Sequence, residues 1–264
     1  MNFKEKLLEA APRGIGLCVG LDPVLDKMPP RFQRGDQPLL DFCAGIVAAT
    51  SDLASAYKPN LAFFEAYGWS GWRQLEQLIR LIPRDKIVIA DAKRGDIGNT
   101  AAAYAQAIFD ILGADAVTVH PWLGTDSLEP FLKNPDHGAF ILAVTSNPSG
   151  RELQELSAEG EPMFQHVIKM AKRLSVKGNV GLVAGATRPE LWPQILDCAE
   201  FLPILAPGIG AQGGDLEALK KAAQGYPAPM LVNASRSILY ASSGDDYQEA
   251  AHCEAQNLIN QLRA

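Results

Sequence analysis

Three charged residues, Asp91, Lys93 and Asp96, lie within six positions of one another. The apolar run 87–90 before them predicts a β-strand. Residues i and i+2 of a strand point to the same face, so Asp91 and Lys93 project together where this strand ends, and Asp96 follows on the turn into a helix. Charges gathered there are costly to desolvate unless they pair or act on a substrate. A purely structural ion pair is the alternative interpretation, and the rest of the chain argues against it.

Polar residues also follow most of the other apolar runs. Parallel barrels carry their active sites at the carboxyl ends of the strands, so this pattern predicts a site there. The polar groups at these ends are Asp22, Lys58, Asn60, Asp91, Lys93, His120, Thr145, Ser146, Asn147, Thr187, the loop 208–215, Ser235 and Arg236.

A phosphate site is predicted at the last two strand ends. The loop 207–215 is rich in glycine, which lets backbone N–H groups approach an anion, and a helix N-terminus follows it. Arg236, after the final strand, offers a two-pronged donor to phosphate. A flexible glycine turn with an unrelated surface arginine is the alternative.

Eight short apolar runs position these residues, and a segment of helical periodicity follows each run. The alternation predicts an α/β protein, a single (β/α)8 TIM barrel over residues 1–264 with a short N-terminal helix. A doubly wound open sheet is the competing fold, but its G-x-G-x-x-G fingerprint is absent after the first run. The predicted strands are 16–21, 55–59, 87–91, 116–120, 140–145, 181–186, 204–207 and 230–234. The predicted helices are about 36–53, 69–82, 97–112, 124–132, 161–176, 188–198, 214–224 and 246–262.

Composition narrows the class of protein. Lys and Arg total 24 against 30 Asp and Glu, a net charge of −6, which argues against nucleic-acid and anionic-membrane partners. The four cysteines are far apart and form no C-x-x-C pair, as expected of reduced thiols. The charged N-terminus is unlike a signal peptide, and no long apolar stretch predicts a membrane span. We therefore expect a cytoplasmic protein, with its four tryptophans packed inside.

With these residues in view, the chain resembles the orotidine 5′-phosphate decarboxylase family, and in particular its longer bacterial branch. The resemblance runs over nearly the whole length. The Asn233-Ala234-Ser235 triplet is a small departure, since many relatives carry a glycine there. The matching segments are Gly20-Leu21-Asp22-Pro23, Tyr57-Lys58-Pro59-Asn60, Asp91-x-Lys93-x-x-Asp96-Ile97-x-x-Thr100, Thr145-Ser146-Asn147-Pro148, 208–215 and Ser235-Arg236-Ser237-Ile238.

The resemblance implies decarboxylation of orotidine 5′-monophosphate to UMP and CO2 without metal or organic cofactor. Lys93 would stabilise the developing carbanion at C6 of the pyrimidine and then protonate it. Asp91 would lie near the substrate carboxylate and hold Lys93 in place. Lys58 and Asp96 would complete the array of alternating charges, with Lys58 also contacting the ribose, as would Asp22.

The resemblance further implies a homodimer in which Asp96 and Thr100 reach the neighbouring active site. Ser146 would recognise the pyrimidine, and the segment 148–160 is expected to close over the substrate as a lid. The roles of Asn60, His120, Thr187 and Arg188 stay open. The residues expected to complete substrate binding are Ile97, Gln212, Gly213 and Arg236.

Two rival functions remain. The first is a metal-dependent sugar-phosphate decarboxylase of the same barrel superfamily, which shares D-x-K-x-x-D and would lose activity in a chelator. The second is a catalytically silent nucleotide-binding homologue. The intact Asp91, Lys93 and Asp96 argue against the second, and the Ser146 segment argues against the first.

Overall fold

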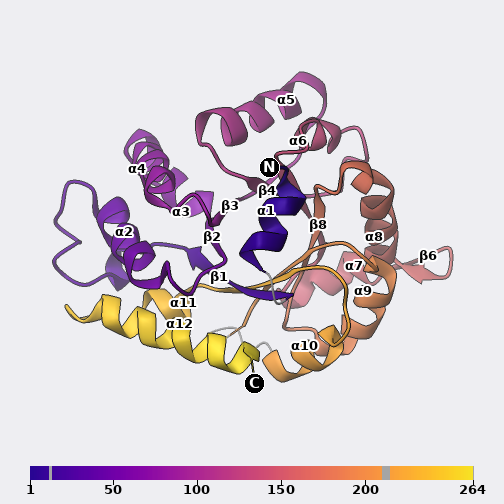
Figure 1. Cartoon of the computed structure of the whole chain (residues 1–264). Coiled ribbons are helices and arrows are strands. Elements are labelled where there is room, and N and C mark those ends of the chain that lie inside the picture. Colours follow the sequence, from indigo (N-terminus) through magenta and orange to yellow (C-terminus); the bar gives the residue numbers. More distant parts are fainter. Residues whose placement is uncertain (12–13, 210–214, 264) are drawn as a thin grey trace.

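The computed structural model describes residues 1–11, 14–209 and 215–263. Within these ranges eight parallel strands close a barrel, in the order β1-β10-β9-β8-β5-β4-β3-β2 around the ring (Figure 1). Pairing of β1 with β10 closes it, with Ile15 opposite Met230 and Val19 opposite Ala234. The predicted barrel is confirmed. Its strands are β1 (Ile15–Leu21), β2 (Ala56–Pro59), β3 (Ile87–Arg94), β4 (Ala116–Val119), β5 (Gly138–Val144), β8 (Val180–Ala184), β9 (Ile204–Pro207) and β10 (Met230–Ala234).

Helices surround the strands on the outside of the ring (Figure 1). Seven of the eight predicted connecting helices are confirmed with bounds shifted by a few residues. Among these seven, the helix predicted at 97–112 continues past Gln106 as a π-helical turn, Ala107–Ile111. The connecting helices are α2 (Pro38–Thr50), α4 (Gly68–Leu81), α5 (Gly98–Gln106), α6 (Glu129–Leu132), α8 (Met163–Leu174), α9 (Trp192–Ala199), α10 (Leu216–Ala223) and α12 (Tyr247–Arg263).

The helix predicted at 124–132 is wrong in length, because only Glu129–Leu132 is helical. Gly124 has φ of 86°, which is outside the right-handed helical region. The Ser127 hydroxyl donates to the Gly124 carbonyl at 2.6 Å and stabilises a turn in place of a helix.

Short elements that the sequence did not predict lie beside several strand ends. In α3, Asn60 is the N-cap, and its side chain accepts from the Ala62 N–H at 3.3 Å. These elements are α3 (Leu61–Glu65), α7 (Arg151–Gln154), α11 (Arg236–Leu239) and the antiparallel pair β6 (Ser157–Ala158) and β7 (Glu161–Pro162).

The N-terminal helix α1 (Phe3–Ala10) covers the amino-terminal end of the barrel, and Figure 1 shows it across the middle of the ring. The rings of Phe3 and Phe140 meet edge to face at 6.0 Å. Gly138 leaves the space for this contact, since a Cβ there would lie 2.4 Å from the Phe3 ring. With this end filled, a substrate has to enter from the carboxyl ends of the strands.

The tryptophans differ from the expectation that all of them pack inside. Trp192 is fully buried, whereas Trp69 and Trp122 are largely exposed. Trp122 lies directly after the β4 end and Trp69 in the first turn of α4, so neither is covered by the chain's own helices. Among the described helices, none is both long and apolar enough to cross a membrane.

Candidate active site

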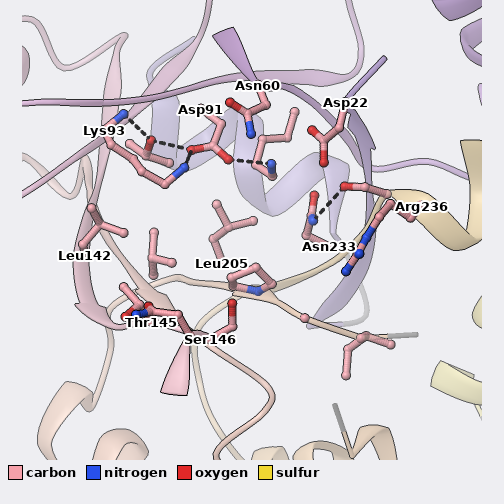
Figure 2. A pocket seen from close by; sticks show the side chains of 18 residues that line it. Asp22, Asn60, Asp91, Lys93, Leu142, Thr145, Ser146, Leu205, Asn233 and Arg236 are labelled. Atoms are coloured by element: carbon pink, nitrogen blue, oxygen red, sulfur yellow. Dashed lines mark hydrogen bonds and ion pairs between the residues drawn. The ribbon is translucent and has the colours of Figure 1, made fainter. Parts of the chain in front are cut away.

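A cavity of about 390 Å³ opens at the carboxyl ends of the strands, opposite α1. Figure 2 shows charged and polar side chains converging on it from several strands. Predicted site residues that line it are Asp22, Lys58, Asp91, Lys93, Ser146 and Arg236. The structure therefore brings together residues that are up to about two hundred positions apart in the chain.

The strand period of two explains why the polar side chains gather at one level. On β3, Ile87 and Ile89 are buried in the barrel interior, and Asp91 follows on the same face. On β2, Ala56 fills the interior and Lys58 follows it. Apolar side chains thus pack the lower layers, and the last inward position of each strand faces the cavity.

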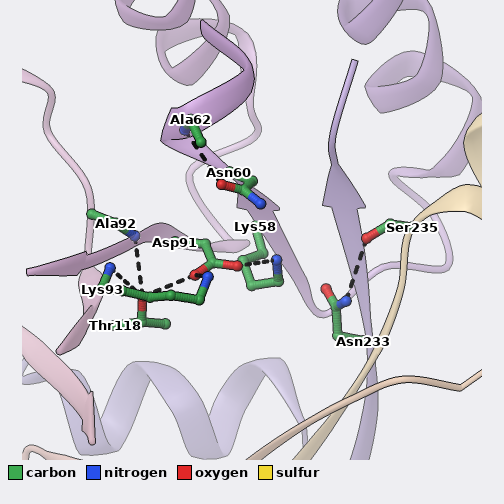
Figure 3. A network of polar contacts seen from close by, with 9 residues as sticks. All are labelled: Lys58, Asn60, Ala62, Asp91, Ala92, Lys93, Thr118, Asn233 and Ser235. Carbon is green, nitrogen blue, oxygen red and sulfur yellow. Dashed lines mark hydrogen bonds and ion pairs between the residues drawn. The ribbon is translucent and has the colours of Figure 1, made fainter. Parts of the chain in front are cut away.

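Asp91 lies between two lysines. Its Oδ2 is 2.7 Å from the Lys58 Nζ, and its Oδ1 is 2.6 Å from the Lys93 Nζ (Figure 3). The Lys58 side chain is only 4% exposed, whereas that of Lys93 is 52% exposed. The buried lysine is therefore held in a fixed pair, and the exposed one extends into the cavity where a ligand can meet it.

The electrostatic balance keeps this group ionised. Burial by itself raises the pKa of Asp91, but the charges of Lys58 and Lys93 outweigh it and hold that pKa well below the ordinary value. Burial lowers the pKa of Lys58, but Asp91 and Asp22 outweigh it and raise that pKa above the ordinary value. Both partners of the Lys58–Asp91 pair are thus charged at neutral pH.

Thr118 is a cavity residue that the sequence analysis missed. Its hydroxyl is 3.0 Å from the Asp91 Oδ1 and accepts the Ala92 and Lys93 N–H groups at 3.1 and 3.0 Å. The available signal was a hydroxyl inside an otherwise apolar strand, two positions after the interior residue Ala116.

The wall opposite the charged array is apolar. It comes from the inward side chains of β5, β8 and β9, namely Leu142, Val183 and Leu205. A ligand would therefore have one face against ions and another against hydrocarbon. This part of the cavity favours a flat, partly polar ring.

The predicted phosphate end lies only in part within the described residues. Gly208, Ile209, Ser235 and Arg236 line the cavity, while Gln212 and Gly213 lie outside the described residues. Gly20 is required here, because a Cβ at that position would lie 1.8 Å from the Ser235 hydroxyl. Arg236 places a positive charge at this corner of the cavity, which suits an anion.

Two side-chain oxygens at the same end of the cavity are hydrogen-bond acceptors. Within the described chain, Asp22 Oδ1 and Asn233 Oδ1 are buried without a hydrogen-bond partner. Both residues line the cavity, and Asn233 is another residue that the sequence analysis did not assign. A carboxylate or amide oxygen only accepts hydrogen bonds, so a ligand that meets them here should carry hydroxyl groups.

The segment after β5 contributes a polar wall. Thr145, Ser146 and Asn147 line the cavity, and Asn60 lines it from the β2 end. Thr187 supports this wall from behind, since its hydroxyl donates to the Ser146 carbonyl at 3.0 Å. Its contact is with the backbone of the wall and not with the cavity space.

Asp96, Ile97 and Thr100 are not brought to this cavity by their own chain, among the residues that the structure describes. Asp96 Oδ1 accepts the Ile97 N–H at 2.8 Å, and the Ile97 side chain is 58% exposed. Asp96 therefore stands apart from the other three charges of the expected array.

His120 and Arg188, whose roles the sequence left undecided, make contacts outside the charged array. His120 packs against Gly95, where a Cβ would lie 2.2 Å from its Nε2. Arg188 forms ion pairs with Glu155 at 2.6 Å and Glu190 at 2.7 Å. In the described part of the chain, no group of three or more His, Cys, Asp or Glu has an arrangement suited to a metal ion.

Comparison with known proteins supplies independent findings. Residues 16–252 match the family described as "Orotidine 5'-phosphate decarboxylase / HUMPS family". The chain is 48% identical over 268 residues to orotidine 5′-phosphate decarboxylase of Roseiflexus castenholzii, covering all of this chain and 98% of that protein.

Two solved structures are similar along the whole chain. Leishmania donovani OMP decarboxylase has a TM-score of 0.84 at 36% identity, with 100% of this chain and 99% of that chain covered. UMP synthase of the same organism has a TM-score of 0.88 at 38% identity. All of this chain is covered there but only 56% of the UMP synthase, which is a longer protein.

Proposed function

Since the chain belongs to the orotidine 5′-phosphate decarboxylase family, we propose that Lys93 and Asp91 form its reactive centre, with Lys58 supporting them. The enzyme is a carboxy-lyase that converts orotidine 5′-monophosphate to UMP and CO2. The observation that carries the proposal is the row Lys58–Asp91–Lys93, in which one carboxylate is shared by two ammonium groups at 2.7 and 2.6 Å.

In the proposed chemistry the bond between C6 of the pyrimidine and the carboxylate breaks, and its electron pair stays on C6. The Lys93 ammonium stabilises that pair by charge and then transfers a proton to C6. The products are UMP, CO2 and a neutral Lys93 amine, which regains its proton from water. An exposed lysine tethered to a buried carboxylate suits both tasks, because it is positioned and yet reaches the ligand.

Asp91 has two proposed roles. It orients Lys93, and it places a negative charge beside the substrate carboxylate that the reaction removes. Lys58, paired with Asp91 through its other oxygen, keeps that charge in place and contacts the ribose. Asp22 accepts from ribose hydroxyls, for which its unpartnered Oδ1 is suited.

The remaining substrate contacts are assigned by position. Ser146 lies on the polar wall and recognises the pyrimidine edge, and Arg236 binds the phosphate. Gln212 and Gly213, whose family positions lie in the glycine-rich loop, complete the phosphate site. The apolar wall of Leu142, Val183 and Leu205 receives the face of the ring.

We also propose that the protein works as a homodimer, with Asp96, Ile97 and Thr100 completing the active site of the neighbouring subunit. These residues lie on the loop after β3 and the start of α5, outside their own cavity. The next loop carries Trp122, whose side chain is 71% exposed. Tryptophan is enriched in protein interfaces, and the exposed Trp122 and Ile97 offer apolar surface that a second subunit could cover.

Three broader assignments stay proposals. The chain forms one domain, which the pairing of its first and last barrel strands supports. The reaction proceeds without metal or organic cofactor, and the protein resides in the cytoplasm. The segment 148–160 closes over bound substrate, so that water is excluded and the charges act at full strength.

The test of the reactive centre is Lys93→Ala. We expect decarboxylation, followed by ultraviolet absorbance of orotidine 5′-monophosphate, to fall to below about a thousandth of the wild-type kcat, since charge stabilisation and proton donation are both lost. Lys169→Ala, which removes an exposed lysine on α8, is the matched control and should retain full activity. A Lys93→Ala enzyme with more than about a tenth of the wild-type kcat would contradict the proton-donor role.

The same assay with EDTA tests whether a metal ion takes part in the reaction. Activity that survives the chelator supports the cofactor-free reaction, whereas loss of activity would show that the enzyme needs a metal ion.

A further inference from the structure

Thr118 occupies a place in the site that none of the substrate contacts explains. It lies on β4 and is only 2% exposed, and its hydroxyl faces the row of charges instead of the apolar wall. A buried hydroxyl needs hydrogen-bond partners, and here all of them belong to the catalytic segment of β3 (Figure 3).

The Thr118 hydroxyl can satisfy its three partners in only one arrangement. A threonine hydroxyl has one hydrogen to donate and two lone pairs to accept with. The Ala92 and Lys93 N–H groups occupy the acceptor positions at 3.1 and 3.0 Å. The single hydrogen is therefore directed to Asp91 Oδ1, 3.0 Å away, and Asp91 must accept it as a carboxylate.

The backbone of β3 needs such a partner at this point. The register between β3 and β4 shifts between Ala90 and Arg94, so the ladder of backbone hydrogen bonds is interrupted. Lys93 has φ of 47°, a left-handed conformation that is costly for a residue other than glycine. The Thr118 oxygen takes the place of a strand carbonyl for the two N–H groups in this bulge.

The two functions of the hydroxyl converge on one side chain. The hydroxyl holds the Lys93 backbone by accepting its N–H. It also holds the Lys93 ammonium indirectly, because the hydroxyl and the ammonium both donate to Asp91 Oδ1. The Lys93 side chain is otherwise half exposed, so its position depends on these two anchors. Resting on the proposed role of Lys93, we propose that Thr118 is a positioning residue that aims the Lys93 ammonium at the reacting carbon.

The test compares Thr118→Val with Thr118→Ser. Valine keeps the shape and removes every hydrogen bond, and serine keeps the hydroxyl. We expect Thr118→Val to lower kcat on the order of 10- to 100-fold, the effect of misplacing a reacting group by about 1 Å, with KM for orotidine 5′-monophosphate changed less than about threefold. Thr118→Ser should stay within about threefold of wild type in kcat.

The small change in KM and the recovery of kcat by serine distinguish positioning from general loosening of the fold. The matched control is Thr50→Val. Thr50 is equally buried and donates to the Ile46 carbonyl at 2.8 Å, remote from the cavity, so kcat of Thr50→Val should be unchanged.

Several outcomes would overturn the inference. One is a folded Thr118→Val with wild-type kcat, and another is a kcat loss that Thr50→Val shares. If Thr118→Val does not fold, Thr118→Cys replaces it, since a thiol of similar size is only a weak donor and acceptor; wild-type kcat in that variant has the same meaning. Lys93→Ala is assayed in parallel, because its retained activity would place the failure in the proposed role of Lys93 and not in that of Thr118.

Discussion

At the scale of single residues, the buried pair of Lys58 and Asp91 concentrates the electrostatics of the site. Lys58 sits among strand side chains with little access to water, and its ammonium is stable there only because Asp91 and Asp22 lie close to it. Asp91 in turn depends on both lysines to stay ionised. Removing one partner of such a pair leaves an uncompensated buried charge.

Asp91→Asn should therefore destabilise the fold as well as abolish activity, by about 3 kcal/mol at pH 7. Asp91 has a lowered pKa in the folded state, so its contribution is complete above its unfolded pKa of about 3.9 and declines as the pH falls toward the folded value. The difference in free energy of unfolding between wild type and Asp91→Asn should thus be largest above about pH 5 and shrink on acidification.

Denaturant unfolding between about pH 3 and 7 measures this difference. Asp126→Asn, at an exposed loop position, is the control and should change the free energy of unfolding by less than about 0.5 kcal/mol throughout. A pH-independent difference for Asp91→Asn would mean that the two lysines do not lower the pKa of Asp91 in the folded protein.

At the scale of elements, hydrogen bonds and an ion pair attach helix α7, in the segment after β5, to two neighbouring parts of the site. Gln154 of α7 accepts the Thr145 N–H at 3.0 Å and donates to the Thr145 hydroxyl at 2.8 Å. We call these two hydrogen bonds the Gln154 clamp. Gly150 leaves room for it, since any larger residue there would place a Cβ 2.7 Å from the Thr145 hydroxyl. The Arg188–Glu155 pair joins the end of α7 to the segment after β8. These contacts fasten α7 to the cavity wall and to the segment after β8.

Gln154→Ala removes both hydrogen bonds of the clamp. If the segment closes over substrate, the closed state should lose stability, and kcat/KM should fall roughly tenfold, the equivalent of about 1.4 kcal/mol for two hydrogen bonds. Proteolysis within 148–160 should also become faster, and saturating UMP should slow it less than in wild type.

Gln165→Ala on α8 is the matched control, since it too removes a side-chain hydrogen bond, to Gln194 at 3.4 Å, but away from the cavity. Equal kcat/KM in Gln154→Ala and wild type would show that the clamp does not contribute to closure.

At the scale of the whole molecule, the four charges of the expected array do not meet within one chain. Lys58, Asp91 and Lys93 line the cavity, whereas Asp96 lies on the outer rim with Ile97 and near the exposed Trp122 loop. His120, against Gly95, joins these two loops into one surface. A second subunit placed on this surface would cover the apolar side chains and deliver Asp96 to the other cavity.

Mixing two inactive variants tests the shared site. In a mixed dimer of Lys93→Ala and Asp96→Asn, one site carries both changes and the other carries neither. After subunit exchange we expect activity to return to about a quarter of the wild-type value, because half of the dimers are mixed and half of their sites are intact.

Mixing Lys93→Ala with Lys58→Met is the control and should restore nothing, because both residues belong to the same subunit's site. If Lys93→Ala with Asp96→Asn also stays inactive although sedimentation shows mixed dimers, Asp96 serves its own subunit or has no part in the reaction.

The sequence by itself determined the barrel, the level of the site within it and most of the polar groups that line it. These features depend on periodicity, which is local: alternation along each strand places Ile87, Ile89 and Asp91 on one face whatever their partners are. The same local signal located Lys58, Ser146 and Arg236 at strand ends. Gln212 and Gly213 lie outside the described residues, so their place stays a prediction.

Only the tertiary structure decided which groups meet and at what distance. The left-handed Lys93, the hydroxyl of Thr118 that supports it, and the unpartnered oxygen of Asn233 all depend on neighbouring strands whose register no single segment encodes. The exposure of Trp122 was missed for the same reason, whereas the shortened α6 follows from a local turn at 124–127 that hydrophobic periodicity does not reveal. Burial and hydrogen bonding are properties of residues distant in the chain, and they become defined only when the barrel closes.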